Sequence, residues 1–299
     1  MRSLPIYYSP KMAVDSESYS PSSLKPRFLA DRLLKCKNVS IRDFEPATFQ
    51  QLVLSHAPTY VDDVLNLRFE NGFGNKSAAI RDALPWIVGA EIAAAEHAAR
   101  DKTLTWALCS GFHHAHENRN GGFCTFEGLS ITGRVLHTKQ LADKILIVDG
   151  DAHYGDGTVA CIHGDPSFEY ISYATQVKGE AVIADLTERI ERFKPEIVLF
   201  QDGLDSYKYD PLSNDGLTYQ GLIERTSNIA KICRDSRLGL CINLAGGYLR
   251  CNSSDNEIEP VLAGHMNAIK VSAEAYGIEI PEITLVLDGV WETEASYAN

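Results

Sequence analysis

Acidic and imidazole side chains gather directly after a short apolar run near the middle of the chain. The run, Ile-Leu-Ile-Val at residues 145–148, is typical of a buried strand, and Asp149, Asp151, His153 and Asp156 follow it. The first three are spaced by two, so on an extended backbone their side chains point to one side. A carboxylate and an imidazole on the same side make two ligands of a divalent metal site. The alternative is a polar strand-to-loop junction in which an aspartate caps a helix.

Three further polar groups also come after apolar runs that predict strands. They are His113 and His114 after residues 104–109, Asp202 and Asp205 after residues 197–200, and Tyr248 after residues 238–244. In an open parallel sheet the carboxyl ends of the strands share one edge, and ligands bind beyond that edge. We therefore expect these side chains to meet in one site, although each group alone also fits a structural role.

Asp151, His153 and Asp205 together offer an O, N, O ligand set. A catalytic zinc takes three protein ligands and leaves a position for water. Bound zinc lowers the pKa of that water to about 7, which makes it a nucleophile at neutral pH. Two carboxylates and one imidazole also suit Fe²⁺ or Co²⁺, so the pattern predicts a divalent metal site without fixing the ion.

Hydrolysis of an amide also needs a base for the water and an acid for the leaving amine. His113 and His114 are the available pair. A carboxylate behind a histidine fixes its tautomer and raises its basicity, and Asp149 and Asp156 are suitable partners. Tyr248 follows two glycines and could donate its hydroxyl to the oxyanion that forms beside the metal.

The elements that must position these side chains alternate along the chain. Helical patterns, notably an alanine-rich stretch at residues 80–99, lie between apolar runs that predict strands. The predicted strands span residues 5–8, 39–42, 104–109, 145–148, 168–173, 197–200, 238–244 and 283–287. Alternating strands and helices predict an α/β fold with a parallel sheet covered on both faces. No linker or repeat divides the sequence, so we expect one domain over residues 1–299.

The composition disfavours several classes of protein. The formal net charge of the 299 residues is -12, which argues against electrostatic binding to nucleic acid and weakly favours a cationic substrate. The seven cysteines, an odd number without a Cys-x-x-Cys pair, mostly stand in apolar runs (Cys109, Cys161, Cys241), as buried thiols do. This suggests a reducing compartment, so we expect a cytoplasmic protein. We see no signal peptide and no apolar run near the roughly 20 residues that span a bilayer, and we expect no membrane partner.

Taken together, these motifs resemble those of the zinc-dependent histone deacetylase family, which includes acetylpolyamine amidohydrolases and bacterial deacetylase-like proteins. The resemblance covers roughly residues 50–270. It is carried by Gly111-Phe112-His113-His114-Ala115, Gly122-Phe123-Cys124, Asp149-Gly150-Asp151-Ala152-His153-Tyr154-Gly155-Asp156-Gly157, Asp205 with Asp210-Pro211-Leu212 and Gly216-Leu217-Thr218, and Gly246-Gly247-Tyr248.

The resemblance implies a three-layer α/β/α arginase-deacetylase fold with a mainly parallel eight-stranded sheet. It implies that Asp151, His153 and Asp205 bind zinc. It also implies that Asp149 backs His113, that Asp156 backs His114, and that Tyr248 polarises the carbonyl of an acylated amine.

A substrate channel and potassium sites are implied in the same way. Phe123 would form one wall of a narrow acyl-lysine channel, whose further lining residues would be Gly122, Leu212 and Gly247. A potassium ion beside the zinc would be held, largely through backbone carbonyls, by Asp149, Asp151, His153, Ser172 and Tyr173. An outer potassium would lie near Ile162, Asp165 and Phe168.

The chain departs from the family pattern at three places. Tyr154 stands where the family often has a second histidine. Residues 173–179 lead almost directly into a helix, where many members have a long loop that supplies the opposite channel wall. Leu212 stands where a polyamine-selective member has glutamate, which favours an acyl-lysine or a neutral substrate over a polyamine.

Two alternatives to a deacetylase stay open at this point. A ureohydrolase of the same fold would need two metals and a later Asp-x-Asp, whereas Asp202 and Asp205 have the wrong spacing. A non-catalytic acyl-lysine-binding protein would not need Tyr248 and the two histidines, all of which are present. The sequence leaves open whether the substrate is an acetyl-lysine peptide, an acetylpolyamine, an amine with a longer acyl chain or a small metabolite. It also leaves open whether the protein is an oligomer.

Overall fold

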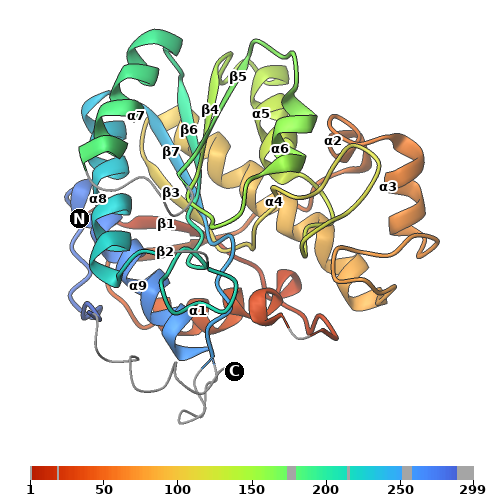
Figure 1. The fold of residues 1–299 in the computed structure, drawn as a ribbon, viewed down its shortest axis with the longest axis horizontal. Helices are drawn as coiled ribbons and strands as arrows, with labels where there is room; N and C mark the ends of the chain where they lie inside the picture. Colours follow the sequence, from red (N-terminus) through yellow and green to blue (C-terminus); the bar gives the residue numbers. More distant parts are fainter. Residues whose placement is uncertain (1, 19, 174–179, 214–215, 251–257, 288–299) are drawn as a thin grey trace.

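Seven parallel strands form one sheet at the centre of the molecule (Figure 1). The computed structural model describes residues 2–18, 20–173, 180–213, 216–250 and 258–287. The strands are β1 (Leu4–Tyr7), β2 (Val39–Arg42), β3 (Leu104–Ala107), β4 (Ile145–Asp149), β5 (Phe168–Ser172), β6 (Ile197–Gln201) and β7 (Gly239–Asn243). Their order is β2-β1-β3-β7-β6-β4-β5, and each neighbouring pair is parallel. The strands that precede the predicted site residues, β3, β7, β6 and β4, are therefore consecutive neighbours in the sheet.

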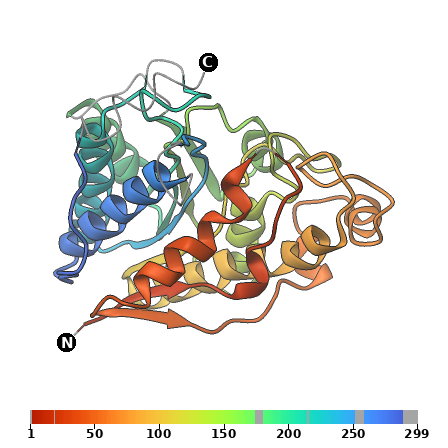
Figure 2. The same cartoon turned by 90° about the horizontal axis from the view of Figure 1, so that it is seen from below.

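Helices cover both faces of this sheet and make three layers. The first face packs against α1 (Lys25–Leu33), α7 (Glu180–Phe193), α8 (Tyr219–Asp235) and α9 (Glu259–Ala275). The second packs against α4 (Ala78–Asp101) and α5 (Gly128–Thr138), around which lie α2 (Phe49–Leu52), α3 (Pro58–Leu65) and α6 (Asp156–Ile162). Figure 2 shows α1 and α9 side by side, with two 3-10 turns (Pro10–Met12 and Pro21–Ser23) ahead of α1. The α/β class and the three-layer arrangement predicted above are thus confirmed.

The alanine-rich stretch forms α4, which has a proline inside it. Pro85 cannot donate a backbone hydrogen bond, and its carbonyl accepts the N–H of Ala47 at 2.8 Å. One turn later, a Cβ on Gly89 would lie 2.5 Å from the carbonyl oxygen of Glu45. The glycine therefore allows the segment that follows β2 to cross directly over the helix.

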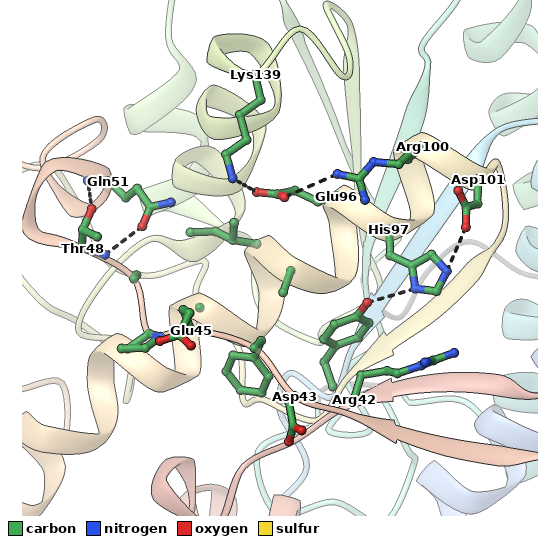
Figure 3. A pocket seen from close by; sticks show the side chains of 17 residues that line it. Arg42, Asp43, Glu45, Thr48, Gln51, Glu96, His97, Arg100, Asp101 and Lys139 are labelled. Carbon is green, nitrogen blue, oxygen red and sulfur yellow. Dashed lines mark hydrogen bonds and ion pairs between the residues drawn. The ribbon is translucent and has the colours of Figure 1, made fainter.

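A hollow of about 750 Å³ lies beside this crossing, away from the strand ends that carry the predicted site (Figure 3). In it the Tyr7 hydroxyl is 2.9 Å from His97 Nδ1, and the other ring nitrogen of His97 is 3.2 Å from Asp101. Lys139 and Arg100 both contact the Glu96 carboxylate. Several charged side chains that line the hollow thus form ion pairs with one another. None of the predicted site residues lines it.

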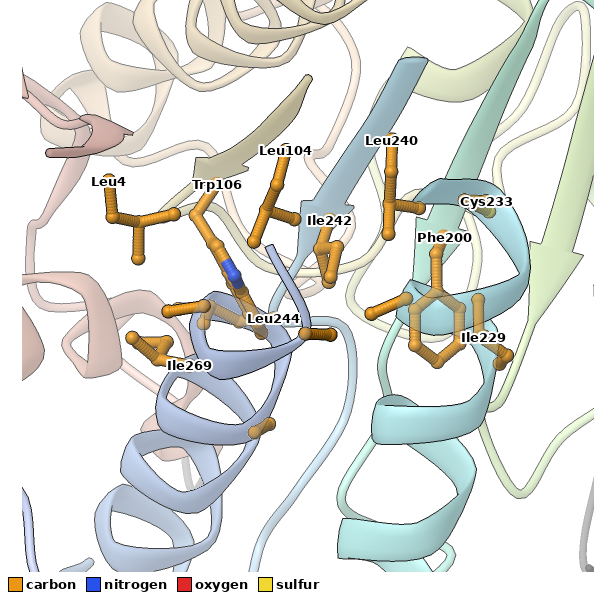
Figure 4. Packing of buried hydrophobic residues seen from close by; sticks show 14 of the residues in the cluster. Leu4, Leu104, Trp106, Phe200, Ile229, Cys233, Leu240, Ile242, Leu244 and Ile269 are labelled. Atoms are coloured by element: carbon orange, nitrogen blue, oxygen red, sulfur yellow. The ribbon is translucent and has the colours of Figure 1, made fainter. Parts of the chain in front are cut away.

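Alternate residues of the central strands enter the two cores, because successive side chains of a strand point to opposite faces. Figure 4 shows Leu104 and Trp106 of β3, together with Leu240 of β7, in the core on the α8–α9 side. They pack near Ile229 of α8 and Ile269 of α9. Each fully buried side chain of this size contributes roughly 2 kcal/mol to stability. Burial on both faces explains why these strands read as unbroken apolar runs.

The eighth predicted strand, residues 283–287, is wrong. These residues belong to the described part of the chain but pair with no strand there. Their backbone bonds to a side chain instead of to a neighbouring strand. The amide of Asn267, on α9, donates to the Val286 carbonyl at 2.7 Å and accepts the Val286 N–H at 2.9 Å. Ile283 still packs in the core. The rest of the segment is half-buried or exposed, so the apolar pattern reported the burial of Ile283 alone and not strand pairing. The eight-stranded sheet is corrected to seven strands within the described residues.

Among the described helices, none combines the length and the apolar character that a bilayer crossing requires.

Candidate active site

Two carboxylates and an imidazole from neighbouring strand ends form a compact group. Asp151 and His153 follow β4, and Asp205 follows β6, which pairs with β4. His153 Nδ1 lies 3.0 Å from an oxygen of Asp151 and 3.0 Å from an oxygen of Asp205. One ligand atom from each residue lies within 4.8 Å of the others. The O, N, O set predicted from the sequence is therefore assembled in space.

The surroundings of this group fit a divalent cation. Asp151 and Asp205 are buried, and burial together with the facing Asp151 carboxylate raises the pKa of Asp205 above its ordinary value. Two buried carboxylates at contact distance repel each other unless a positive charge lies between them. A Cβ on Gly246 would lie 2.4 Å from Asp205 Oδ2 and 2.7 Å from Asp151 Oδ2, so the backbone approaches the carboxylates as only glycine allows.

His113 lies beside the carboxylate group and is held by Asp149. His113 Nδ1 donates to Asp149 Oδ2 at 2.7 Å, while its Nε2 lies 3.6 Å from Asp151 Oδ1. The other oxygen of Asp149 accepts the Asp151 N–H at 3.0 Å and the Gln201 amide at 3.3 Å. Although burial opposes its charge, the facing carboxylates of Asp149 and Asp151 raise the pKa of His113 to about 10. A cation held by Asp151 would offset this negative field.

His114 has a second carboxylate partner but a different environment. Its Nδ1 donates to Asp156 Oδ1 at 2.7 Å, and the other oxygen of Asp156 contacts His116 at 2.9 Å. The rings of His113 and His114 are 4.1 Å apart between centroids. Burial and the neighbouring His113 lower the pKa of His114, so the two imidazoles differ in proton affinity. Gly122 has a positive φ of 45°, and a Cβ there would lie 2.3 Å from the His114 ring.

Tyr248 is held at the same edge by contacts to its own backbone. Asp210 Oδ2 accepts the N–H of Tyr248 at 2.6 Å and that of Leu249 at 3.0 Å. The buried Lys25 donates to the carbonyls of Ala245 and Gly246, at 2.7 and 2.9 Å, and so fixes the preceding turn. Burial raises the pKa of the Tyr248 hydroxyl, and the nearby aspartates raise it further, which keeps the hydroxyl protonated as a donor.

The predicted channel residues lie around Tyr248. The centroid of the Phe123 ring is 5.6 Å from that of Tyr248 and 5.8 Å from that of Phe73, so three aromatic rings pack at tilted angles along this side. Leu212 is half-buried, and its N–H donates to Asp210, the residue that holds Tyr248. Gly247 has a φ of 126°, which side chains rarely allow. The short segment expected to affect the opposite wall, residues 174–179, lies outside the described residues.

Two of the residues expected to hold potassium lie side by side at the ends of neighbouring strands. Asp149 and Ser172 are register partners on β4 and β5, and the Asp149 carbonyl accepts the Tyr173 N–H at 2.6 Å. Near the expected outer ion, the Arg134 guanidinium donates to the Cys161 carbonyl at 2.7 Å and lies 3.8 Å from Asp165. A positive charge thus stands beside the Ile162–Phe168 turn, where an outer cation was expected.

Several contacts in the site come from residues that the sequence reasoning missed. Lys25 and Gln201 carry no local signal, because their partners lie far away along the chain. Arg225 could have been noticed from the sequence, because it is a charged residue on the otherwise apolar face of α8. Its guanidinium donates to the carbonyls of Gly150 and Gly203 and pairs with Asp202. This pairing commits Asp202 to an ion pair, which removes it as a second metal ligand of the ureohydrolase type.

A parallel α/β/α sheet with this Asp-His-Asp group at its central strand ends has the architecture of the arginase-deacetylase fold. Comparison with known proteins identifies the family. The family model described as "Histone deacetylase domain" matches residues 22–179 and 173–263. The chain therefore belongs to the histone deacetylase family.

Individual relatives are distant. The chain is 23% identical to "Histone deacetylase 10, chloroplastic" of Oryza sativa subsp. japonica, over 80% of this chain and 68% of the relative. It is 26% identical to "Acetoin utilization protein AcuC" of Staphylococcus aureus (strain COL), over 54% of this chain and 50% of that protein. The crystal structure of the HDA15 HD domain superposes with a TM-score of 0.75 at 19% identity, over 92% of this chain and 90% of that one, which supports the shared fold.

Proposed function

We propose that this protein is a metal-dependent amidohydrolase that removes an acetyl or another acyl group from an amine, such as the side chain of a lysine. The family supports an acyl-amine deacetylase in general terms. The single observation that carries the proposal is the placement of two His–Asp pairs and a tyrosine around one Asp-His-Asp group. We further propose that the 299 residues act as one catalytic domain in the cytoplasm, without nucleic acid or membrane as a partner.

We propose zinc as the ion, held by Asp151, His153 and Asp205, with Fe²⁺ or Co²⁺ as substitutes. Such an ion, when bound, supplies a water of lowered pKa and polarises the substrate carbonyl. The inner potassium proposed at Asp149, Asp151, His153, Ser172 and Tyr173 would add positive charge behind this group. Metal binding would also relieve the repulsion between the two buried carboxylates.

The remaining steps fall to side chains of this protein. His113 has its Nδ1 bonded to Asp149, so its Nε2 is the atom that can take or return a proton at the site. His114, which Asp156 holds, lies next to it and is the partner for delivering a proton to the leaving amine. The Tyr248 hydroxyl would donate to the developing oxyanion. Phe123 and Phe73 would line the entry of an uncharged acyl chain.

A direct test combines metal analysis with turnover. The purified protein is loaded with zinc and assayed on a fluorogenic acetyl-lysine peptide, then on peptides with longer acyl chains, an acetylpolyamine and small N-acetylated metabolites. We expect hydroxamate-sensitive turnover, which Asp205→Asn should lose together with the metal. Asp235→Asn, on the exposed end of α8, should keep both.

Absence of hydroxamate-sensitive turnover on every acyl-amide by the zinc-loaded protein would contradict the proposal. Manganese-dependent release of urea would instead favour a ureohydrolase. Tight binding of an acyl-lysine peptide without turnover would indicate a non-catalytic binding protein.

A further inference from the structure

A tyrosine outside the predicted site contacts the carboxylate that backs His113. Tyr170 lies on β5, opposite Ile147 of β4. Its hydroxyl donates to Asp149 Oδ2 at 2.9 Å, and this is the same oxygen that accepts His113 Nδ1 at 2.7 Å. One carboxylate oxygen therefore receives both the imidazole and the phenol.

The tyrosine hydroxyl also contacts the backbone of the loop between β4 and α6, which carries Asp151 and His153. Gly155 N–H donates to the Tyr170 oxygen at 2.9 Å. Gly155 is the N-cap of α6, whose first residue is Asp156, the partner of His114. The Tyr170 hydroxyl thus links the Asp149 carboxylate to the start of the helix that carries the second carboxylate.

The backbone of Gly155 packs closely against this hydroxyl. A Cβ on Gly155 would lie 2.6 Å from the Tyr170 hydroxyl, 2.9 Å from Asp149 Oδ2 and 3.0 Å from His113 Cβ. The exposed Tyr154 ring packs edge-on against the half-buried Tyr170 ring, with centroids 5.9 Å apart. The Tyr154 ring and the Gly155 backbone thus restrict the space around the Tyr170 side chain.

We propose that Tyr170 is a positioning residue for His113, acting through Asp149. The hydroxyl fixes the rotation of the carboxylate, so that one oxygen faces His113 Nδ1 while the other accepts from Asp151 N–H and Gln201. The imidazole is then held in the tautomer that leaves Nε2 free to exchange a proton. This inference rests on the proposed function, because it assigns the fixed imidazole a role in proton transfer.

The test compares Tyr170→Phe with Tyr60→Phe in the full-length, zinc-loaded protein. Tyr60 is a matched control, because its buried hydroxyl also donates one hydrogen bond, to the Thr125 carbonyl at 2.7 Å, away from both His–Asp pairs. We expect Tyr170→Phe to lower kcat about tenfold, a part of the roughly 10²- to 10⁴-fold that a positioned acid–base group supplies. KM and zinc content should stay within twofold, because the Tyr170 hydroxyl bonds to Asp149 and Gly155 and not to one of the three proposed zinc ligands. Tyr60→Phe should keep the wild-type kcat.

A double-mutant cycle shows whether Tyr170 acts through Asp149. In an Asp149→Asn background, Tyr170→Phe should change kcat less than twofold, because the group it positions has been altered. A tenfold loss that persists in that background would overturn the inference. An equal loss of kcat in Tyr170→Phe and Tyr60→Phe would overturn it as well.

A spectroscopic measurement separates this inference from the proposed function. Without the phenol, Asp149 Oδ2 accepts one hydrogen bond fewer, so its hydrogen bond from His113 Nδ1 becomes stronger. We therefore expect the Nδ1 proton resonance of His113, assigned by its absence in His113→Ala, to move downfield in Tyr170→Phe and to stay unchanged in Tyr60→Phe. If the wild type turns over no acyl-amide, the proposed function fails, and this resonance alone decides: a downfield shift supports the role of Tyr170, and an unchanged position refutes it.

Discussion

Arg225 and Asp202 form an ion pair within the protein, with 2.8 Å between Nη2 and Oδ1 and with side chains that are only 2% and 0% exposed. The same guanidinium donates to the carbonyl of Gly150 at 2.5 Å and to that of Gly203 at 2.9 Å. Gly150 precedes Asp151, and Gly203 lies two residues before Asp205. A single buried cation therefore ties together the two loops that carry the proposed metal carboxylates.

This pair leads to the first prediction. Arg225→Met should lower the free energy of unfolding by about 3–5 kcal/mol, because it leaves Asp202 charged and buried without a partner. The double variant Asp202→Asn, Arg225→Met should lose less, since it removes both charges. Urea denaturation of the three proteins checks this. A double variant no more stable than Arg225→Met would show that the charge pairing is not what stabilises these loops.

The second prediction concerns Gly246. Its replacement by alanine should abolish zinc binding, because the new Cβ would lie 2.4 Å from Asp205 Oδ2. Gly221→Ala is the matched control: it lies in α8, and the nearest atom to its Cβ would be 3.4 Å away. Titration with zinc at constant pH measures both affinities. Zinc binding by Gly246→Ala at wild-type strength would argue against a metal between Asp151 and Asp205.

The third prediction separates the oxyanion donor from the metal ligands. Tyr248→Phe should keep zinc but lower kcat by a factor of about 10²–10³, the usual effect of removing one preorganised donor. The hydroxyl has a raised pKa, so in the wild type it carries its proton across the neutral range. Steady-state kinetics and metal analysis on the same preparation check both parts. An unchanged kcat would contradict the role proposed for Tyr248.

The fourth prediction concerns the pH dependence of stability and a buried carboxylate on α4. Glu91 of α4 is fully buried between Cys109 and Cys241, and burial raises its pKa to about 7 from an ordinary value of 4.5. Below pH 4.5 both the folded and unfolded states hold the proton. As the pH rises toward 7, only the unfolded state releases it, so stability falls, by roughly 3 kcal/mol once both states are ionised.

Glu91→Gln should remove this loss. Relative to the wild type, we expect the variant to be of similar stability near pH 4.5 and more stable by roughly 3 kcal/mol at pH 8. Chemical denaturation at a series of pH values measures the difference. A difference in unfolding free energy that does not vary between pH 4.5 and 8 would show that Glu91 keeps an ordinary proton affinity.

The strand ends and the residues after them were predictable, because both depend on neighbouring residues. Apolar runs indicated β3, β4, β6 and β7, and the two-residue spacing of Asp151 and His153 placed both on one side. The last apolar run, residues 283–287, has the same local pattern, but the strand predicted there is wrong. An apolar run indicates a strand only where another strand is available to pair with it, and here only Ile283 of the run is buried.

The sequence by itself determined the α/β class, the histidine and aspartate motifs and the residue types available for a metal site, since these follow from local periodicity and spacing. Only the tertiary structure decided that β3, β7, β6 and β4 are neighbours, which brings Asp205 to Asp151. It also placed Lys25 under the glycine turn and Tyr170 on Asp149. Such contacts join residues far apart along the chain, and the packing of whole helices and strands, rather than any local pattern, selects them.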